Sequence, residues 1–302
     1  MAKGFTDKDV PDQSGRTFLV TGANTGLGFE ASLVLARRGA RVLLGCRSES
    51  KARSAIDKIT SSVPDADLGF IALDQGDLAS VAEAADEVMS EPCLDVLVNN
   101  AGIMVPPMGL TVDGFENQFG VNHLGTFALT SHLLPKLAEQ TGARVVVTSS
   151  IAHRGGSIFF DDIDAEAGYQ AQARYGQSKL ANLLFAYELD RRLRRVESPI
   201  AAVACHPGLA ATDLGRHMPK PLMLAMPLLK VAFNSAAAGA WPTLMAATAV
   251  GVSGGDYIGP SKRGETAGPA VKVTSSATSQ DVQLAERLWD LSIDFTGVDP
   301  EI

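Results

Sequence analysis

The chain of 302 residues has few cysteines and no excess of positive charge, and both shortages exclude classes of protein. Its three cysteines, Cys46, Cys93 and Cys205, include no metal-binding CxxC pair. A small, odd number of cysteines is typical of a reduced, intracellular protein. Acidic residues outnumber basic ones by 34 to 26, which argues against binding to nucleic acid or to an anionic membrane surface.

Long apolar runs are also lacking. The first fifteen residues are polar and have no signal-peptide core. The most apolar later stretch, 221–233, contains Pro227 and Lys230 and is too short to span a bilayer. The five histidines include no HExxH motif, so no metal site is predicted. We therefore expect a cytoplasmic protein without a transmembrane segment.

What the chain does contain is a regular alternation of apolar strands and helices. Helical patterns lie between the apolar runs, which are continuous, as in a parallel sheet that is buried on both faces. This order predicts an α/β fold, a single-domain Rossmann fold with a doubly wound, mainly parallel sheet and helices on both faces. Strands are expected at 16–22, 41–46, 68–74, 94–102, 143–150 and 199–208, and helices at 29–40, 47–59, 78–90, 115–140 and 175–195.

No repeat, low-complexity tract or linker divides the chain, so residues 1–302 are expected to form one catalytic domain. A variable substrate-lid segment is predicted at 209–240 and a tail after residue 260. The sequence GVSGG (251–255) fits the nucleophile elbow of hydrolases, but a helical stretch precedes it where the elbow needs a strand. It is therefore interpreted as a loop.

A glycine-rich turn, TGANTGLG (21–28), follows the first strand and opens the first helix. Gly22, Gly26 and Gly28 would let backbone N–H groups and the helix N-terminus approach a pyrophosphate. At the end of the second strand, Cys46 stands where an NAD site usually has an acidic residue, and Arg47 follows it. An arginine without a neighbouring carboxylate suits a ribose 2′-phosphate, which favours NADP(H) over NAD(H). The alternative is that Arg47 is a solvated residue at a helix start.

Tyr175 and Lys179 form the only Tyr/Lys pair at helical i,i+4 spacing. Such a pair either lies on a solvated helix face or serves to make the tyrosine more acidic. The spacing alone does not distinguish these two interpretations.

Taken together, the motifs resemble the short-chain dehydrogenase/reductase family over nearly the whole chain. In family order they are TGANTGLG (21–28), Asp74, NNAG (99–102), Asn122, Ser150, YGQSK (175–179) and HPGLAAT (206–212). The branch that the chain looks most like is the retinol dehydrogenase-like, NADP-preferring one. Four stretches carry that likeness: GCRS (45–48), SSIAH (149–153), SKLAN (178–182) and HPG (206–208).

The resemblance implies four catalytic residues. Tyr175 would be the general acid/base for a carbonyl, Lys179 would lower its pKa and bind the nicotinamide ribose, Ser150 would orient the substrate oxygen, and Asn122 would hold a water that links Lys179 to solvent. Ser149 is expected to point away from Ser150, because successive strand side chains alternate.

The resemblance also implies the cofactor contacts. Asp74 would accept from the adenine amino group, and the 206–212 loop would hold the nicotinamide carboxamide. The full implied set is Gly22, Asn24, Thr25, Gly26, Leu27, Gly28, Arg47, Asp74, Gln75, Asn100, Ala101, Gly102, Tyr175, Lys179, Pro207, Gly208 and Thr212.

An insert of unusual length separates Ser150 from Tyr175. It is expected to cover part of the active site or the edge of a dimer interface, which leaves a homo-oligomer open. Apolar residues at 221–233 and at Phe159 and Phe160 suggest a lipophilic alcohol or carbonyl substrate. Two alternatives to a carbonyl/alcohol oxidoreductase stay open: a light-driven protochlorophyllide-type reductase and a non-catalytic NADP(H)-binding sensor.

Overall fold

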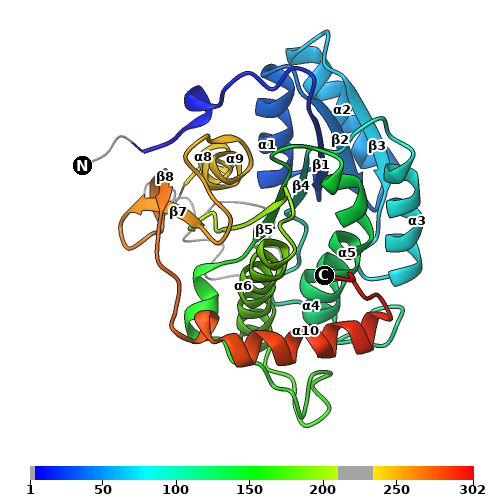
Figure 1. The fold of residues 1–302 in the computed structure, drawn as a ribbon, viewed down its shortest axis with the longest axis vertical. Coiled ribbons are helices and arrows are strands. Elements are labelled where there is room, and N and C mark those ends of the chain that lie inside the picture. The colour runs from blue at the N-terminus through cyan, green and yellow to red at the C-terminus, as the bar shows by residue number, and fades with distance from the viewer. Residues whose placement is uncertain (1–3, 210–233) are drawn as a thin grey trace.

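The computed structural model describes residues 4–209 and 234–302, and one eight-stranded sheet lies at its centre (Figure 1). The strand order is β3-β2-β1-β4-β5-β6-β7-β8, and all neighbours are parallel except the pair β7 and β8. The strands are β1 (Thr17–Thr21), β2 (Arg41–Cys46), β3 (Leu68–Ala72), β4 (Val96–Asn99), β5 (Arg144–Thr148), β6 (Ala201–Cys205), β7 (Tyr257–Lys262) and β8 (Ala267–Lys272). The predicted single-domain, doubly wound fold is confirmed.

Helices cover both faces of the sheet (Figure 1). They are α1 (Gly26–Arg37), α2 (Glu49–Ser62), α3 (Leu78–Met89), α4 (Asn117–Phe119), α5 (Gly125–Ala138), α6 (Ala171–Arg195), α8 (Ala236–Gly239), α9 (Trp241–Thr248) and α10 (Val282–Thr296). No helix in the described part of the chain is long and apolar enough to cross a membrane.

Strand alternation divides the apolar side chains between two cores. Phe18 and Val20 of β1 face a core with α1, α2 and α9, whereas Leu19 between them faces a core with α3, α5 and α6. Because every residue of β1 is buried, the strand reads as one apolar run rather than an alternating one.

The predicted helix over 115–140 is interrupted in the structure. A π-helical turn, Gly120–Leu124, lies between α4 and α5 and carries the buried Asn122. Single π-helical turns often occur at functional positions, because the extra residue in the turn re-aims its side chain.

The predicted tail after residue 260 is wrong. These residues form the end of β7, the antiparallel strand β8 and the helix α10, which packs against α6. The pattern of α10 is amphipathic, with Ala285, Leu288, Trp289 and Ser292 buried, so a helical periodicity was present in the sequence. The interpretation of GVSGG as a loop is confirmed, since residues 251–255 form turns before β7.

The sheet order changes direction between β1 and β4. Chain connections leave β1 toward β2 on one side and reach β4 on the other, so a crevice opens beyond the carboxyl ends of these strands. The predicted site residues lie at this edge.

Candidate active site

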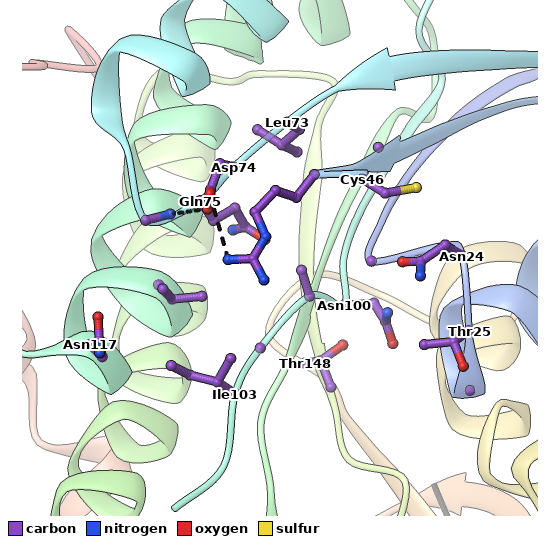
Figure 2. A pocket seen from close by; sticks show the side chains of 18 of the residues that line it. Asn24, Thr25, Cys46, Leu73, Asp74, Gln75, Asn100, Ile103, Asn117 and Thr148 are labelled. Atoms are coloured by element: carbon purple, nitrogen blue, oxygen red, sulfur yellow. Dashed lines mark hydrogen bonds and ion pairs between the residues drawn. The ribbon is translucent and has the colours of Figure 1, made fainter. Parts of the chain in front are cut away.

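One cleft of about 490 Å³ collects most of the predicted site residues at this edge. Figure 2 shows side chains from four turns around it: Asn24 and Thr25 after β1, Cys46 at the end of β2, Asp74 after β3 and Asn100 after β4. The predicted residues that line it are Gly22, Asn24, Thr25, Gly26, Leu27, Arg47, Asp74, Gln75, Asn100, Ala101, Gly102, Tyr175, Lys179 and Pro207.

The backbone of the glycine-rich turn packs too closely against its neighbours to carry side chains at its glycines. Gly22 has a left-handed backbone, with φ of 67°, and a Cβ on Gly28 would lie 2.5 Å from the carbonyl oxygen of Gly22. A Cβ on Gly102 would lie 3.0 Å from Asn122 Oδ1 and 3.4 Å from Lys179 Nζ. These bare backbones fit a dinucleotide, whose phosphates and ribose need close approach to N–H groups.

Thr21 fixes the NNAG segment beside this turn. Its hydroxyl oxygen accepts hydrogen bonds from the backbone N–H groups of Asn100, at 3.0 Å, and Ala101, at 2.9 Å. The Asn100 side chain in turn donates to the Thr21 carbonyl at 2.8 Å. The sequence interpretation did not single out Thr21, although it is the residue that opens the motif.

Arg47 has a carboxylate beside it, contrary to the expectation from the sequence. Its guanidinium lies 3.6 Å from Asp74 Oδ2. One of the two dashed lines that end at Asp74 in Figure 2 marks this ion pair. The two residues are far apart in the sequence, and the parallel pairing of β2 with β3 brings their strand ends together. Arg47 stays largely exposed, with 79% of its side chain accessible, so this ion pair is weak and open to competition by an anion.

Asp74 and Gln75 differ in how they reach the cleft. Asp74 Oδ1 accepts from the Gly76 N–H at 3.0 Å, as in an Asx turn. The Gln75 side chain is buried and donates to Thr126 at 3.1 Å. The Gln75 amide nitrogen is therefore held by α5, and its amide oxygen has no hydrogen-bond partner among the described residues.

Tyr175 and Lys179 are both buried on α6, so the solvated-face alternative is excluded. Lys179 Nζ lies 5.8 Å from the centre of the Tyr175 ring and donates to the Thr148 carbonyl at 3.2 Å. Burial lowers the pKa of Lys179 to about 8, because a low-dielectric site disfavours the ammonium.

Burial also acts on the phenol, in the opposite direction. It raises the pKa of Tyr175, and a hydrogen bond with Ser150 offsets part of that rise. Contrary to the lowering expected from Lys179, the Tyr175 pKa therefore lies above its ordinary value, because removing the phenolate from water outweighs the hydrogen bond.

Ser150 and Ser149 divide their tasks at the end of β5. Ser150 caps the 3-10 helix Ile151–Gly155, accepting from the Ala152 N–H at 3.2 Å, and is hydrogen-bonded to Tyr175. The Ser149 hydroxyl donates to the Lys179 carbonyl at 2.7 Å. Ser149 thus supports α6 and, as expected, turns away from the position of Ser150.

Asn122 is fully buried in the π-helical turn. Its Oδ1 accepts from the Ile103 N–H at 2.7 Å, and its Nδ2 donates to the Ile103 carbonyl and to Ser178 Oγ. Asn122 therefore clamps the chain that leaves Gly102, next to Lys179.

The HPG segment follows β6. His206 Nδ1 accepts from the Gly208 N–H at 3.2 Å, so His206 shapes the turn, as expected. Gly208 has φ of 72°, and a Cβ there would lie 2.5 Å from the Thr266 carbonyl oxygen. Thr212 and the stretch 221–233 lie outside the described residues.

Comparison with known proteins identifies the family. The family model for short chain dehydrogenase matches residues 16–222. The chain belongs to the short-chain dehydrogenase/reductase family and is an oxidoreductase that interconverts CH–OH and C=O groups with a nicotinamide cofactor.

Similar proteins place it more narrowly, with the retinol dehydrogenase-like members. Retinol dehydrogenase 14 of Mus musculus is 38% identical, with 94% of this chain and 86% of that protein covered. Retinol dehydrogenase 12 of Mus musculus is 39% identical, with 97% and 89% covered.

Solved structures agree with the fold. An uncharacterized protein from Mycobacterium paratuberculosis has a TM-score of 0.83 at 39% identity, covering 99% of this chain and 100% of that one. A short-chain dehydrogenase from Shigella flexneri, complexed with NADP, has a TM-score of 0.56 at 27% identity, covering 70% of this chain and 84% of that one.

Proposed function

We propose that this protein is an NADP(H)-dependent oxidoreductase that interconverts a carbonyl and an alcohol on a lipophilic substrate, with Tyr175 as general acid/base. The observation that carries the proposal is the burial of Tyr175 and Lys179 side by side on α6, at a cleft that the glycine-rich turn also lines. The cofactor, when bound, supplies or accepts the hydride.

Tyr175 would move the proton. Since burial raises its pKa, the phenol keeps its proton at neutral pH and is ready to donate it to a carbonyl oxygen. Ser150, hydrogen-bonded to Tyr175, would donate to the same oxygen and hold it in place. This protonation state favours carbonyl reduction over alcohol oxidation near neutral pH.

Lys179 and Asn122 would prepare the cofactor end of the cleft. Lys179 presents its ammonium beside the bare backbone of Gly102, where a ribose hydroxyl could accept from it. Asn122 would keep that backbone fixed through Ile103, and we assign it the relay of a water to Lys179.

Arg47 supports the preference for NADP(H). Its exposed guanidinium, held loosely by Asp74, could form a charge-assisted bond with a 2′-phosphate, while the neutral Cys46 offers no carboxylate to a ribose hydroxyl. The similar protein from Shigella flexneri is described as complexed with NADP, which is consistent with this choice.

Replacing Arg47 tests the preference. Arg47→Ala should raise the KM for NADPH about tenfold, the loss expected for one charge-assisted contact, and leave the KM for NADH nearly unchanged. The control is Arg53→Ala, which removes another exposed arginine, one that pairs with Glu49 on α2. Equal effects of Arg47→Ala on both cofactors would contradict the assignment.

Two observations support the proposal of a lipophilic substrate. The similar proteins are named retinol dehydrogenases, and the cleft that Tyr175 lines also has the apolar Ile103 in its wall. The neighbouring exposed side chains of the loop after β4, Met108 and Leu110, are also apolar. Turnover of small polar carbonyls alone would contradict this part of the proposal.

The central experiment measures NADPH consumption with a panel of apolar aldehydes and ketones. Wild-type protein should consume NADPH, and Tyr175→Phe should bind NADPH equally well but lose at least a hundredfold in kcat, the usual contribution of a positioned general acid. If both proteins bind NADPH but neither consumes it, the catalytic proposal fails.

Neither alternative from the sequence is favoured. The relatives are named dehydrogenases. Tyr175 and Lys179 line one cleft, Ser150 is hydrogen-bonded to Tyr175, and Asn122 lies with Lys179 against Gly102, an arrangement that a sensor would not require. The cytoplasmic location and a homo-oligomer stay predictions.

A further inference from the structure

The tip of the β7–β8 hairpin, residues 263–266, carries a carboxylate that joins two loops of the proposed site. Glu265 accepts hydrogen bonds from Arg154 Nη2 on both of its oxygens, at 3.1 and 3.0 Å. Its Oε2 also lies 3.2 Å from His206 Nε2. Arg154 belongs to the loop after β5, and His206 to the loop after β6.

The hydrogen bonds around His206 define its tautomer. Because the Gly208 N–H donates to Nδ1, the ring proton lies on Nε2 and is donated to Glu265. Burial lowers the pKa of His206 to about 3, so the ring stays neutral. One chain of bonds therefore runs from Glu265 through the imidazole to the backbone of Gly208.

A second chain of bonds reaches Ser150. Arg154 also donates to the Thr274 carbonyl at 2.8 Å, which ties the 3-10 helix Ile151–Gly155 to the segment after β8. The neighbouring His153 accepts from the Ser276 N–H at Nε2, so its Nδ1–H donates to the Ser150 carbonyl at 2.6 Å.

The backbone of Glu265 is in the left-handed region, with φ of 66°, between Gly264 and a Thr266 whose carbonyl accepts from the Leu209 N–H at 2.9 Å. A non-glycine residue in this conformation is strained, and such strained residues cluster at functional sites. Glycine would relieve this strain but could not reach Arg154 or His206.

We infer that Glu265 is a positioning residue that fixes the loop of Ser150 and the turn of Pro207 and Gly208 relative to each other. One carboxylate thereby sets the distance between the group that orients the substrate oxygen and the backbone that faces the nicotinamide end of the cleft. The inference rests on the proposed function for those two loops.

The experiment compares wild type with Glu265→Gln, Glu265→Gly and Lys272→Ala. Lys272 lies on the same hairpin and pairs with Asp256 at 2.7 Å, outside the cleft, so it serves as the matched control. Three quantities are measured for each protein: amide hydrogen exchange, the Kd of NADP+ by calorimetry, and kcat and KM with an apolar aldehyde.

Both Glu265 variants should exchange faster at 150–156 and 206–209 and not elsewhere. Their Kd for NADP+ should rise about five- to tenfold, as expected when charge-assisted hydrogen bonds that hold the two loops are lost. Their kcat should fall as well, and Glu265→Gln should be milder than Glu265→Gly because one acceptor oxygen remains. The Tm of Glu265→Gly should stay within a few degrees of wild type, since glycine fits the left-handed backbone.

Lys272→Ala should leave exchange in the two loops, the Kd and kcat unchanged. The inference is overturned if exchange in the two loops is unchanged in both Glu265 variants, if it rises equally across the whole sheet, or if faster exchange leaves Kd and kcat at wild-type values. If wild type binds neither NADP+ nor NAD+, the proposed function fails, and local exchange alone then decides whether Glu265 holds the two loops.

Discussion

At the scale of single residues, one physical cause moves the pKa values of Tyr175 and Lys179 in opposite directions. Burial disfavours the charged form of each group, so the phenol holds its proton more tightly and the ammonium holds its proton less tightly. Near neutral pH the pair is a neutral acid beside a cation, which is the state that carbonyl reduction needs.

The pH dependence of the reaction should therefore report Lys179 on its alkaline side. As pH rises through about 8, Lys179 loses its charge and with it the contact proposed for the ribose, so kcat/KM for NADPH should fall by about tenfold per pH unit above that value. Tyr175, whose pKa is raised, stays protonated over this range. A profile that is flat from pH 7 to 10 would contradict the assignment.

At the scale of elements, the insert between Ser150 and Tyr175 is fastened to the start of α6 and to the loop after β4. Arg174, which is buried, pairs with Asp162 and lies 4.8 Å from the Phe159 ring. The Tyr169 hydroxyl donates to the Pro106 carbonyl at 2.8 Å and accepts from the Gln118 amide at 3.1 Å. The insert thus packs against the loop after β4 without lining the cleft, and its covering of the active site or of a dimer edge stays a prediction.

The Tyr169 contact should matter for substrate binding, because the loop it holds is strained. Val105 has φ of 52°, unusual for a β-branched residue, and its N–H donates to Gln118 at 2.8 Å. Tyr169→Phe should lower the free energy of unfolding by about 1–2 kcal/mol and raise the KM for a bulky apolar aldehyde.

A matched control is Ser131→Ala, which removes a buried hydroxyl that bonds the Phe127 carbonyl and does not line the cleft. Urea denaturation and steady-state kinetics check both variants. If the two variants lose stability alike and neither changes KM, the loop has no part in substrate binding.

At the scale of the whole molecule, α10 converts α6 into a buried helix. In Figure 1 the C-terminal helix lies across α6, and Trp289 of α10 packs edge-on to Phe127 with ring centres 5.3 Å apart. The guanidinium of Arg192 on α6 lies over the same indole, 4.4 Å from the ring centre. Because α6 carries Tyr175 and Lys179, the packing of α10 on α6 stabilises the helix on which these two residues lie.

Trp289→Ala should lower the free energy of unfolding by about 3–5 kcal/mol, the cost of truncating a buried aromatic residue. Leu291→Ala, a half-buried position on the same helix, should cost less. Urea titrations give both values. At low urea the folded Trp289→Ala protein should bind NADP+ with the wild-type Kd, since the indole does not touch the cleft, and a large rise in Kd would show that α10 shapes the site itself.

The sequence by itself determined the fold class, the positions of the first six strands along the chain and the place of most site residues. Continuous apolar runs such as 17–21 and glycines such as Gly22 and Gly28 express local requirements, burial on both faces and close backbone approach, which one stretch of chain reveals. The i,i+4 spacing of Tyr175 and Lys179 is likewise local.

Only the tertiary structure decided the features that depend on distant neighbours. The carboxylate beside Arg47 belongs to Asp74, which follows the neighbouring strand. Glu265, which bonds Arg154 and His206, lies on a hairpin that the sequence suggested was a tail. The direction of the Tyr175 pKa shift depends on how much water α6 and its surroundings exclude. Each of these three features depends on packing between segments that are distant in the sequence, so the spacing of residues along one segment does not predict it.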